Sequence, residues 1–281
     1  MSDTLAAVVI HHRRFPEVLQ TVRSVLDSGV VPASVLVVDN SEDDGIAEAL
    51  RDAAEGWRVH TMANRGYGAA VNAAVPLLPD ADHVLVVTHE VRLDARSLQL
   101  MCQAVDATPT VAVAGPGLLL TEDGDVWSRG GVLTRHLRLP RQLVDDTGTS
   151  TGIHDVDWLD GACAVYRKSV LAEHPFREDF FLYFEETELH ARLRSLGWRV
   201  VTVGGASATQ SSEGMPPFWG CRNVVLFQRA QGTAWSRRIA PLYFTIRTMA
   251  ISVVTGHWAD VRAAPRGLLA GLRATSKASG G

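Results

Sequence analysis

The sequence predicts an α/β protein with a mostly parallel sheet flanked by helices, followed by a C-terminal helical extension. Short apolar runs alternate with helical patterns up to about residue 115. These runs are continuous Val and Leu stretches, which are typical of parallel strands covered on both faces. After residue 232 only helical patterns follow. The 281 residues, 46% of them hydrophobic, are enough to bury a large core.

The periodicity of the apolar residues predicts the individual elements. In the first part, strands are expected at 5–10, 35–38, 58–62, 83–87 and 111–114, and helices at 17–26, 46–54, 69–77 and 95–105. Residues 121–157 are rich in Gly, Asp and Thr, so a loop-rich, partly antiparallel region is expected there, with short strands at 117–120 and 132–133. Further strands are predicted at 158–165 and 200–203, a short helix from about residue 168, and helices at 217–231, 239–254 and 259–274.

Two adjacent acids, Glu185 and Glu186, end an apolar run at the point where a helical pattern begins. Leu189, Leu193 and Leu196 then recur at helical spacing. At about 100° per residue, the two acids lie within roughly 60° of this stripe and should face buried structure. Burial raises the pKa of a carboxyl group, which suits it to accept a proton near neutral pH. The alternative is that these acids only complement the helix dipole.

Cysteine usage and missing motifs exclude several protein classes. Cys102, Cys163 and Cys221 are far apart and form no CxxC pair, which argues against a disulfide framework and a structural zinc site. The sequence has no GxxxxGK[ST] phosphate loop, GxSxG elbow or HExxH motif, and the glycines at 66 and 68 lack the third glycine of a dinucleotide fingerprint. The N-terminus has no basic segment followed by an apolar one, so a cytoplasmic protein is expected.

The net charge of −4 is unevenly distributed. From Arg222 to the end, nine basic residues face a single acid, Asp260, so this part carries +8 and the preceding part −12. A basic tail indicates an anionic surface as a partner, and no nucleic-acid partner is expected. Arg247 interrupts the apolar run at 239–255, so we expect amphipathic helices on the inner face of the plasma membrane rather than a membrane span. The alternatives are packing on the domain or a dimer contact.

Polar residues and a glycine follow the first four predicted strands, at the edge where an open α/β sheet binds ligands. These residues are His11, Asp39, Asn64, Arg65, Gly66, His89 and Glu90. Asp39 could accept hydrogen bonds from a nucleobase or ribose, and Arg65 with nearby backbone amides could bind a phosphate. Glu90 could hold a divalent ion that bridges a diphosphate. Each position taken alone also suits an ordinary turn.

Taken together, the order and spacing of these fragments resemble inverting glycosyltransferases of family 2, which have the Rossmann-like GT-A fold. Within this family the chain looks most like the bacterial rhamnosyltransferase-like branch. The resemblance is carried by residues 37–41, 64–72, 85–93, 158–162, 180–189 and 222–223. It implies a glycosyltransferase domain at 1–232, with a nucleotide-binding half at 1–115 and an acceptor and catalytic half at 116–232. The basic helical tail would occupy 233–281.

The resemblance also implies a reaction and roles for residues. A sugar, rhamnose or another deoxysugar, would move with inversion from a dTDP- or UDP-linked donor to a hydroxyl of a glycan, a lipid-linked glycan or a natural product. Glu186 would be the catalytic base and Glu185 would support it or orient the acceptor. Trp158, Asp160 and Gly161 would border the acceptor pocket. The nucleotide sugar would be bound by Asp39, together with His11, Asn64, Arg65, Gly66, His89 and Glu90.

Two positions depart from the pattern of this family, and both concern the metal. The acidic motif, commonly Asp-x-Asp, is Thr88-His89-Glu90 here, and Gln210 stands near the position of a histidine that the family often has. Glu90 would be one ligand of Mg²⁺ or Mn²⁺ and Gln210 a weaker one. Alternatively, cationic groups such as Arg65 partly replace the metal. These departures leave a catalytically weakened nucleotide-sugar-binding subunit as the alternative function. A nucleotidyltransferase is disfavoured because residues 11–14 are basic but contain no glycine.

Overall fold

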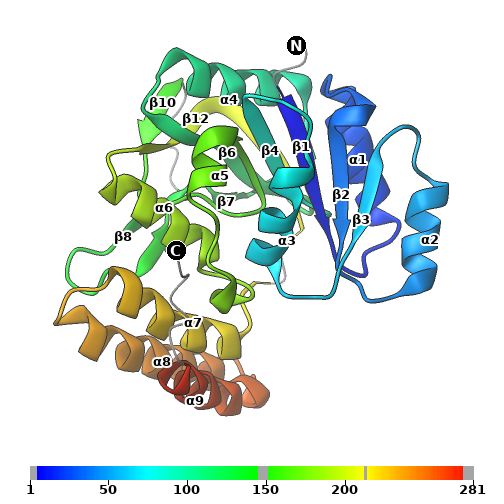
Figure 1. The fold of residues 1–281 in the computed structure, drawn as a ribbon. Coiled ribbons are helices and arrows are strands. Elements are labelled where there is room, and N and C mark those ends of the chain that lie inside the picture. The colour runs from blue at the N-terminus through cyan, green and yellow to red at the C-terminus, as the bar shows by residue number, and fades with distance from the viewer. Residues whose placement is uncertain (1–4, 145–150, 212–213, 275–281) are drawn as a thin grey trace.

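A computed structural model describes residues 5–144, 151–211 and 214–274, so Lys277 of the basic tail lies outside the described residues (Figure 1). Its strands are β1 (Leu5–His11), β2 (Val35–Asp39), β3 (Arg58–Thr61), β4 (His83–Thr88), β5 (Arg92–Leu93), β6 (Val111–Leu120), β7 (Val126–Ser128), β8 (Gly131–Leu133), β9 (Pro140–Gln142), β10 (Gly152–Asp155), β11 (Cys163–Arg167) and β12 (Arg199–Gln210). Its α-helices are α1 (Glu17–Asp27), α2 (Asp44–Asp52), α3 (Tyr67–Ala74), α4 (Ala95–Ala107), α5 (Lys168–Glu173), α6 (Glu185–Ser195), α7 (Pro217–Gln231), α8 (Ser236–Val254) and α9 (Trp258–Arg273).

The central sheet has the strand order β10-β12-β6-β11-β4-β1-β2-β3, with β5 paired to β12 and β7 to β6. Strands β3, β2, β1 and β4 are mutually parallel, and β12 is parallel to β6. Strand β11 is antiparallel to both of its neighbours, β4 and β6. The carboxyl ends of β1, β2, β4, β6 and β12 therefore meet at one edge, and β11 begins at that same edge.

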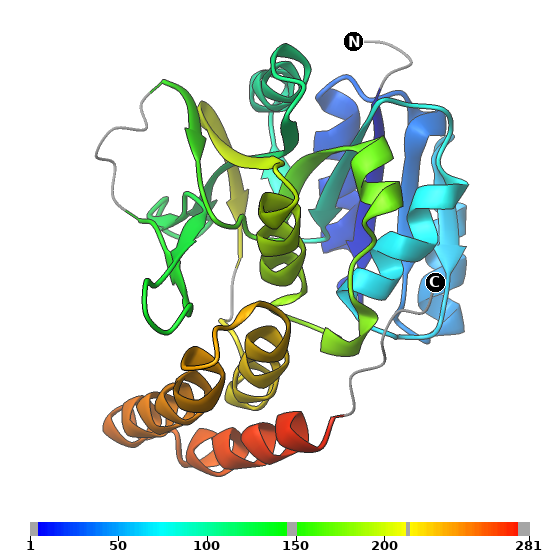
Figure 2. The ribbon, with the colours of Figure 1, turned by 60° about the vertical axis from the view of Figure 1, so that its left-hand side comes forward.

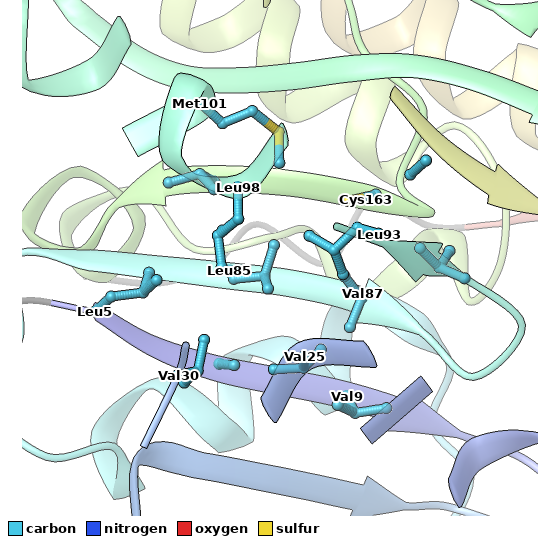
Figure 3. Packing of buried hydrophobic residues seen from close by; sticks show 14 of the residues in the cluster. Leu5, Val9, Val25, Val30, Leu85, Val87, Leu93, Leu98, Met101 and Cys163 are labelled. Atoms are coloured by element: carbon cyan, nitrogen blue, oxygen red, sulfur yellow. The ribbon is translucent and has the colours of Figure 1, made fainter. Parts of the chain in front are cut away.

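Apolar residues alternate between the two faces of the sheet, and helices cover both faces. Val9 and Val87 point to the face covered by α1 and α4, where they pack against Val25 and Met101 (Figure 3). The opposite face packs against apolar residues of α3, α5 and α6. Both faces of the inner strands are thus dry, which explains why these strands are continuous Val and Leu runs. This arrangement confirms the predicted α/β class and the predicted alternation of strands and helices.

The prediction of a strand at 158–165 was wrong in its first half. Strand β11 begins only at Cys163, and Trp158 makes no more than an isolated bridge to Gly131. Residues 158–162 form a loop in which Leu159 packs with Leu189 and Leu193 of α6, and Trp158 lies against Gly131. Buried Trp158 and Leu159 imitate a strand pattern because periodicity reports burial, not backbone pairing. The two strands predicted at 111–114 and 117–120 are one strand, β6, and β12 extends well beyond the predicted 200–203.

The C-terminal helices form a separate layer beside the sheet domain. Helix α7 contacts α6, and α8 and α9 are outermost (Figure 2). Helix α9 approaches the backbone of α7 closely at Gly267, where a Cβ atom would lie 2.2 Å from the carbonyl oxygen of Phe218. One face of the tail therefore packs on the domain, as one of the sequence alternatives expected. Within the described residues, no helix combines the length and the apolar character needed to cross a bilayer.

Candidate active site

A cleft of about 740 Å³ lies at the edge of the sheet where the parallel strands end. The strand-end wall, as we call it, consists of residues at or just after the ends of β1 to β4: His12, Arg14, Asn40, Asn64, Gly66, Thr88, His89 and Glu90. The helix wall consists of residues before β11 and at the start of α6: Trp158, Asp160, Gly161, Phe184, Glu185 and Glu186. Gln210, Met215 and Phe244 line the cleft farther along the chain. Segments that are distant in sequence thus meet at one site.

Two of the expected nucleotide-binding residues, His11 and Asp39, lie behind the strand-end wall. His11 is fully buried and Asp39 is 2% exposed. Nε2 of His11 accepts a hydrogen bond from the backbone amide of Arg14 (3.1 Å), so Nδ1 carries the proton and donates to Asp39 Oδ1 (3.0 Å). Ser41 also donates to Asp39 Oδ1, from its hydroxyl (2.5 Å) and its amide (3.1 Å). Burial alone would raise the pKa of Asp39, but the hydrogen bonds from His11 and Ser41 outweigh it and lower this pKa.

The residues that follow them, His12 and Asn40, face the cleft instead. Asn40 is 3% exposed, and its side-chain oxygen has no hydrogen-bond partner among the described residues. Its amide nitrogen donates to Asn64 Oδ1 at 3.4 Å, and the same oxygen accepts from the amide of Gly66 (3.1 Å). Nδ1 of His12 lies 3.1 Å from the carbonyl oxygen of Asn40. Asn40 was not predicted from the sequence as a binding residue. In the structure, its unpaired buried acceptor at the cleft wall indicates a ligand contact.

Arg65 does not line the cleft. Its side chain is 66% exposed and forms an ion pair with Glu178, outside the cleft. Gly66 does line it, and its conformation has φ of 92°. A Cβ atom at Gly66 would lie 1.9 Å from the carbonyl oxygen of Phe181. Gly66 is therefore the place where the strand-end wall and the loop before α6 touch, and the amide of Tyr67 donates to this carbonyl (2.9 Å).

Glu90 and His89 lie together at the end of β4. Glu90 Oε1 accepts from the Thr88 hydroxyl (2.9 Å), and Glu90 Oε2 lies 3.4 Å from His89 Nε2. Burial lowers the pKa of His89, although the charge of Glu90 opposes this. Gln210, at the end of β12, lines the same cleft because β12 pairs with β5 just after Glu90. Both positions offer oxygen donors, which Mg²⁺ and Mn²⁺ accept. In the described parts of the chain, no group of three or more His, Cys, Asp or Glu could hold a metal ion.

The paired acids stand at the N-terminus of α6 and face the cleft together. Burial raises the pKa of Glu185 to about 7. Burial, followed by the charges of Glu185 and Asp160, raises the pKa of Glu186 well above its usual value. Glu185 Oε2 is buried and has no hydrogen-bond partner among the described residues. Glu186 Oε1 accepts from the Thr187 hydroxyl (3.3 Å). The two neighbouring carboxyl groups, both with raised pKa, thus lie together at the cleft.

Glu188, the third acid of this helix start, faces away from the cleft. It is 2% exposed and lies 3.4 Å from Nε of Arg192, and Gln231 donates to it at 3.0 Å. Glu188 therefore links α6 to α7 through Gln231. Of the three acids at the start of α6, only Glu185 and Glu186 line the cleft.

The loop at 158–162 completes the helix wall. Asp160 lies beside Glu186, and burial raises its pKa despite hydrogen bonds from Ser128, Gln142 and Trp127. A Cβ atom at Gly161 would lie 3.4 Å from the ring of Tyr67 and 3.6 Å from Cγ of Glu186. The hydroxyl of Tyr67 donates to the carbonyl oxygen of Gly161 (2.7 Å). The three residues predicted to border the acceptor, Trp158, Asp160 and Gly161, thus lie next to the carboxyl pair.

A buried histidine of α6 holds this loop in place. Nδ1 of His190 accepts from the backbone amide of Leu159 (3.1 Å), and Nε2 lies 3.0 Å from the hydroxyl of Tyr166. Because Nδ1 accepts, the neutral ring carries its proton on Nε2 and donates it to Tyr166. Burial lowers the pKa of His190 to about 3, so the ring stays neutral over the physiological range.

The loop before α6 has an unusual backbone. Phe181, Tyr183 and Phe184 have φ of 69°, 69° and 72°, a region that L-residues rarely adopt. Asn223 of α7, which is fully buried, donates through its side-chain nitrogen to the carbonyl oxygens of Phe180 (3.0 Å), Leu182 (2.7 Å) and Tyr183 (2.8 Å). The strained loop is therefore held from helix α7, some 40 residues later in the sequence. Arg222, the neighbour of Asn223, also donates to the carbonyl oxygen of Phe180 (3.1 Å).

Replacement of Gly66 by Ala should displace this loop. The new Cβ would meet the carbonyl of Phe181, and the positive φ is strained for alanine, so we expect a loss of about 2 to 4 kcal/mol of stability. Differential scanning fluorimetry and chemical denaturation measure the loss. Gly45→Ala is the matched control: its Cβ would come no closer than 3.4 Å to Asp43 Oδ1, within helix α2, and should leave stability unchanged or slightly raised. Equal stability of the two variants would contradict the contact.

The sequence model of the family described as "Glycosyltransferase like family 2" matches residues 3–238 of the chain. The chain is also similar to N-acetylglucosaminyl-diphospho-decaprenol L-rhamnosyltransferase from Mycobacterium tuberculosis. The two are 27% identical over 283 aligned positions, which cover 88% of this chain and 90% of the relative. The similarity therefore extends over almost the full length of both proteins.

Solved structures with a similar fold include GalNAc-T7 with UDP, GalNAc and Mn²⁺, with a TM-score of 0.68 at 13% identity. The match covers 80% of this chain and 47% of that one, so the chain spans about half the length of GalNAc-T7. The mannosyltransferase PcManGT from Pyrobaculum calidifontis, in complex with GDP-Man and Mn²⁺, has a TM-score of 0.56 at 13% identity, covering 95% of this chain and 85% of that one. At these identities the structures show the fold alone.

The family match spans most of the chain, and the fold agrees with it. The parallel strands end at a cleft that has polar residues of the strand ends on one wall and the carboxyl pair on the other. The chain belongs to glycosyltransferase family 2 and is a glycosyltransferase with the GT-A fold.

Proposed function

We propose that this enzyme transfers a deoxysugar such as rhamnose, with inversion, from a dTDP- or UDP-linked donor to a hydroxyl of a lipid-linked glycan. The observation that carries the proposal is the carboxyl pair Glu185 and Glu186, which faces the strand-end wall across one cleft. The relative from Mycobacterium tuberculosis, whose name describes a rhamnosyl transfer to a diphospho-decaprenol, supports the choice of sugar and of acceptor.

In this proposal Glu186 is the catalytic base. Its carboxylate takes the proton of the acceptor hydroxyl while the acceptor oxygen forms a bond to the anomeric carbon of the donor. The bond from that carbon to the diphosphate breaks on the opposite face, and its electron pair leaves with the diphosphate. Glu185 supports this step electrostatically, because its charge raises the pKa of Glu186 and so strengthens the base. Asp160, Gly161 and Trp158 border the acceptor.

The donor nucleotide is assigned to the strand-end wall. The unpaired oxygen of Asn40 is the acceptor for a nucleobase N–H, and Asp39 with His11 holds the backbone behind it. His12 and Arg14 line the wall where the diphosphate would lie. Glu90 and Gln210 would hold a divalent metal, which when bound neutralises charge on the departing diphosphate. With these two protein oxygens, most of the coordination sphere falls to the diphosphate and water.

A panel of dTDP-, UDP- and GDP-sugars tests the function. Thermal shift with and without Mg²⁺ or Mn²⁺ reports binding, and NMR of the product reports transfer and its anomeric configuration. We expect a dTDP- or UDP-sugar to stabilise the protein and to yield product of inverted configuration. Binding without turnover on any acceptor would favour the nucleotide-sugar-binding subunit instead. A product of retained configuration would exclude Glu186 as the base of a single displacement.

Glu185→Gln should shift the pH dependence of transfer to lower pH. Activity requires the deprotonated base, so kcat/KM should rise with pH along an acidic limb that reports the titration of the carboxyl pair. After burial, the charge of Glu185 contributes most to the raised pKa of Glu186, and the Gln variant removes this charge. The acidic limb should therefore move to lower pH. Initial rates measured from pH 5 to 9 give this profile.

Asp160→Asn provides a graded comparison, because Asp160 raises the pKa of Glu186 less than Glu185 does. In this variant the acidic limb of the kcat/KM profile should also move to lower pH, but by a smaller amount. If the limb stays in place in both variants, the group that titrates in the wild-type profile is not Glu186.

A further inference from the structure

Exposed apolar side chains are concentrated on the two C-terminal helices. Of 18 large apolar side chains exposed in the described parts of the chain, 11 lie between Trp235 and Leu272. On α8, six of the seven form one line, which we call the α8 stripe: Ile239, Leu242, Tyr243, Ile246, Val253 and Val254; Ile251 lies outside it. At about 100° per residue these six positions fall within an arc of roughly 120°. The buried residues of α8, such as Pro241, Thr245 and Ser252, lie on the opposite side of the helix.

Arginines border this stripe, and hardly any acids do. Between Ser236 and Ala274 the chain has six arginines, all exposed, and one acid, Asp260, which is half-buried. By the same helical geometry, Arg238 and Arg247 lie on the two opposite edges of the α8 stripe. Trp258, at the start of α9, is 64% exposed beside the free end of α8. An apolar line with cationic edges and an exposed tryptophan fits the interface of an anionic bilayer, where arginine reaches the headgroups.

We propose that the α8 stripe, with Arg238, Arg247 and Trp258, seats the enzyme on an anionic phospholipid surface, with α8 parallel to the membrane plane. The helix of 19 residues is about 28 Å long, so it lies flat along the interface rather than inserting a tip. A second copy of the chain fits this surface less well. Self-association of α8 would bring arginines together, and the tail residues described offer only Asp260 to neutralise them.

The same helix also reaches the cleft. Phe244, on the inner side of α8, lines the cleft together with Met215 and Phe184. The apolar end of the cleft is therefore separated from the proposed membrane surface by about one helix diameter, roughly 10 Å. An acceptor whose lipid stays in the bilayer could present its sugar to Glu186 over that span. This inference rests on the proposed lipid-linked acceptor and adds where that acceptor enters.

The double variant Leu242→Glu with Ile246→Glu tests the surface. Co-sedimentation of the full chain with phosphatidylcholine vesicles, with and without phosphatidylglycerol, measures binding in the absence of any substrate. We expect the wild type to bind the phosphatidylglycerol vesicles, with binding weakened by salt, and the double variant to bind at least tenfold more weakly. Leu196→Glu is the matched control: Leu196 is 56% exposed, like Leu242 at 54%, but lies outside the tail, and it should bind as the wild type does.

Transfer assays separate this inference from the proposed function. The double variant should lose transfer to a lipid-linked acceptor in vesicles at least tenfold and keep transfer to a short-chain, water-soluble analogue. If wild type and variant bind vesicles equally, or only the oligomeric state changes in light scattering, the membrane inference is overturned while transfer to the soluble analogue still supports the enzyme assignment. Vesicle binding without transfer to either acceptor overturns the proposed reaction and leaves the surface in place.

Discussion

Glu186→Gln should lower kcat for sugar transfer by about 10²- to 10⁴-fold, the range that a general base contributes. Glutamine has nearly the same shape but cannot accept the proton of the acceptor hydroxyl at neutral pH. The proposed donor contacts lie across the cleft on the strand-end wall, so the affinity for the donor nucleotide should change by less than about threefold, a small effect on the scale of binding free energies. Single-turnover rates and isothermal titration calorimetry with the nucleoside diphosphate measure the two quantities.

Glu188→Gln is the matched control for this loss. Glu188 belongs to the same first turn of α6 but pairs with Arg192 and Gln231 outside the cleft. Its replacement should leave kcat within about threefold of the wild type. Stability should fall somewhat, since the ion pair between Glu188 and Arg192 is lost. Turnover of Glu186→Gln at the wild-type rate would remove Glu186 from the mechanism, and an equal loss in both variants would point to damage of α6 instead.

The sheet and most helices were predictable because burial on both faces leaves a strong pattern. Strands such as β1 and β4 are almost continuous apolar runs, and nearly all of their residues are buried. The same signal failed at Trp158 and Leu159, which are buried without belonging to a strand of the central sheet. The edge strand β10 was missed because half of its residues are exposed and it carries no apolar run.

At the strand ends, sequence predicted the place of the cleft but not which neighbour faces it. Successive side chains alternate as a strand ends, so a single step decides between Asp39 and Asn40, or between His11 and His12. The sequence analysis chose Asp39 and His11, and the structure puts both behind the wall. Arg65 was assigned to the nucleotide on charge alone, and the ion pair with Glu178, 113 residues away in sequence, lies beyond any local pattern.

The carboxyl pair was predictable as a pair, yet its setting was not. Glu185 and Glu186 follow an apolar run, and the helical period placed them toward buried structure. Their exact direction depends on the positive φ angles at 181–184, which no local propensity favours in Phe and Tyr. Such a backbone persists only when tertiary contacts hold it. Here that contact comes from Asn223, a residue that the sequence marked only as part of the family resemblance.

Asn223→Asp should cost at least about 3 to 5 kcal/mol of stability and release the loop that positions the carboxyl pair. The replacement keeps the size of the side chain and exchanges its donor nitrogen for an oxygen. That oxygen would face three carbonyl oxygens now 2.7 to 3.0 Å from the nitrogen, in a site with no access to water. Chemical denaturation measures the loss, and limited proteolysis at 180–184 reports whether the loop is released.

Asn223→Ala distinguishes repulsion from the loss of hydrogen bonds. Alanine leaves the carbonyls of Leu182 and Tyr183 without this donor but adds no opposing charge, so its cost should be smaller, about 2 to 3 kcal/mol. In both variants kcat should fall more than the donor affinity, because the loop leads directly into the carboxyl pair and meets the strand-end wall at Gly66. If both variants are as stable as the wild type, the side chain of Asn223 is not what holds the strained backbone at 181–184.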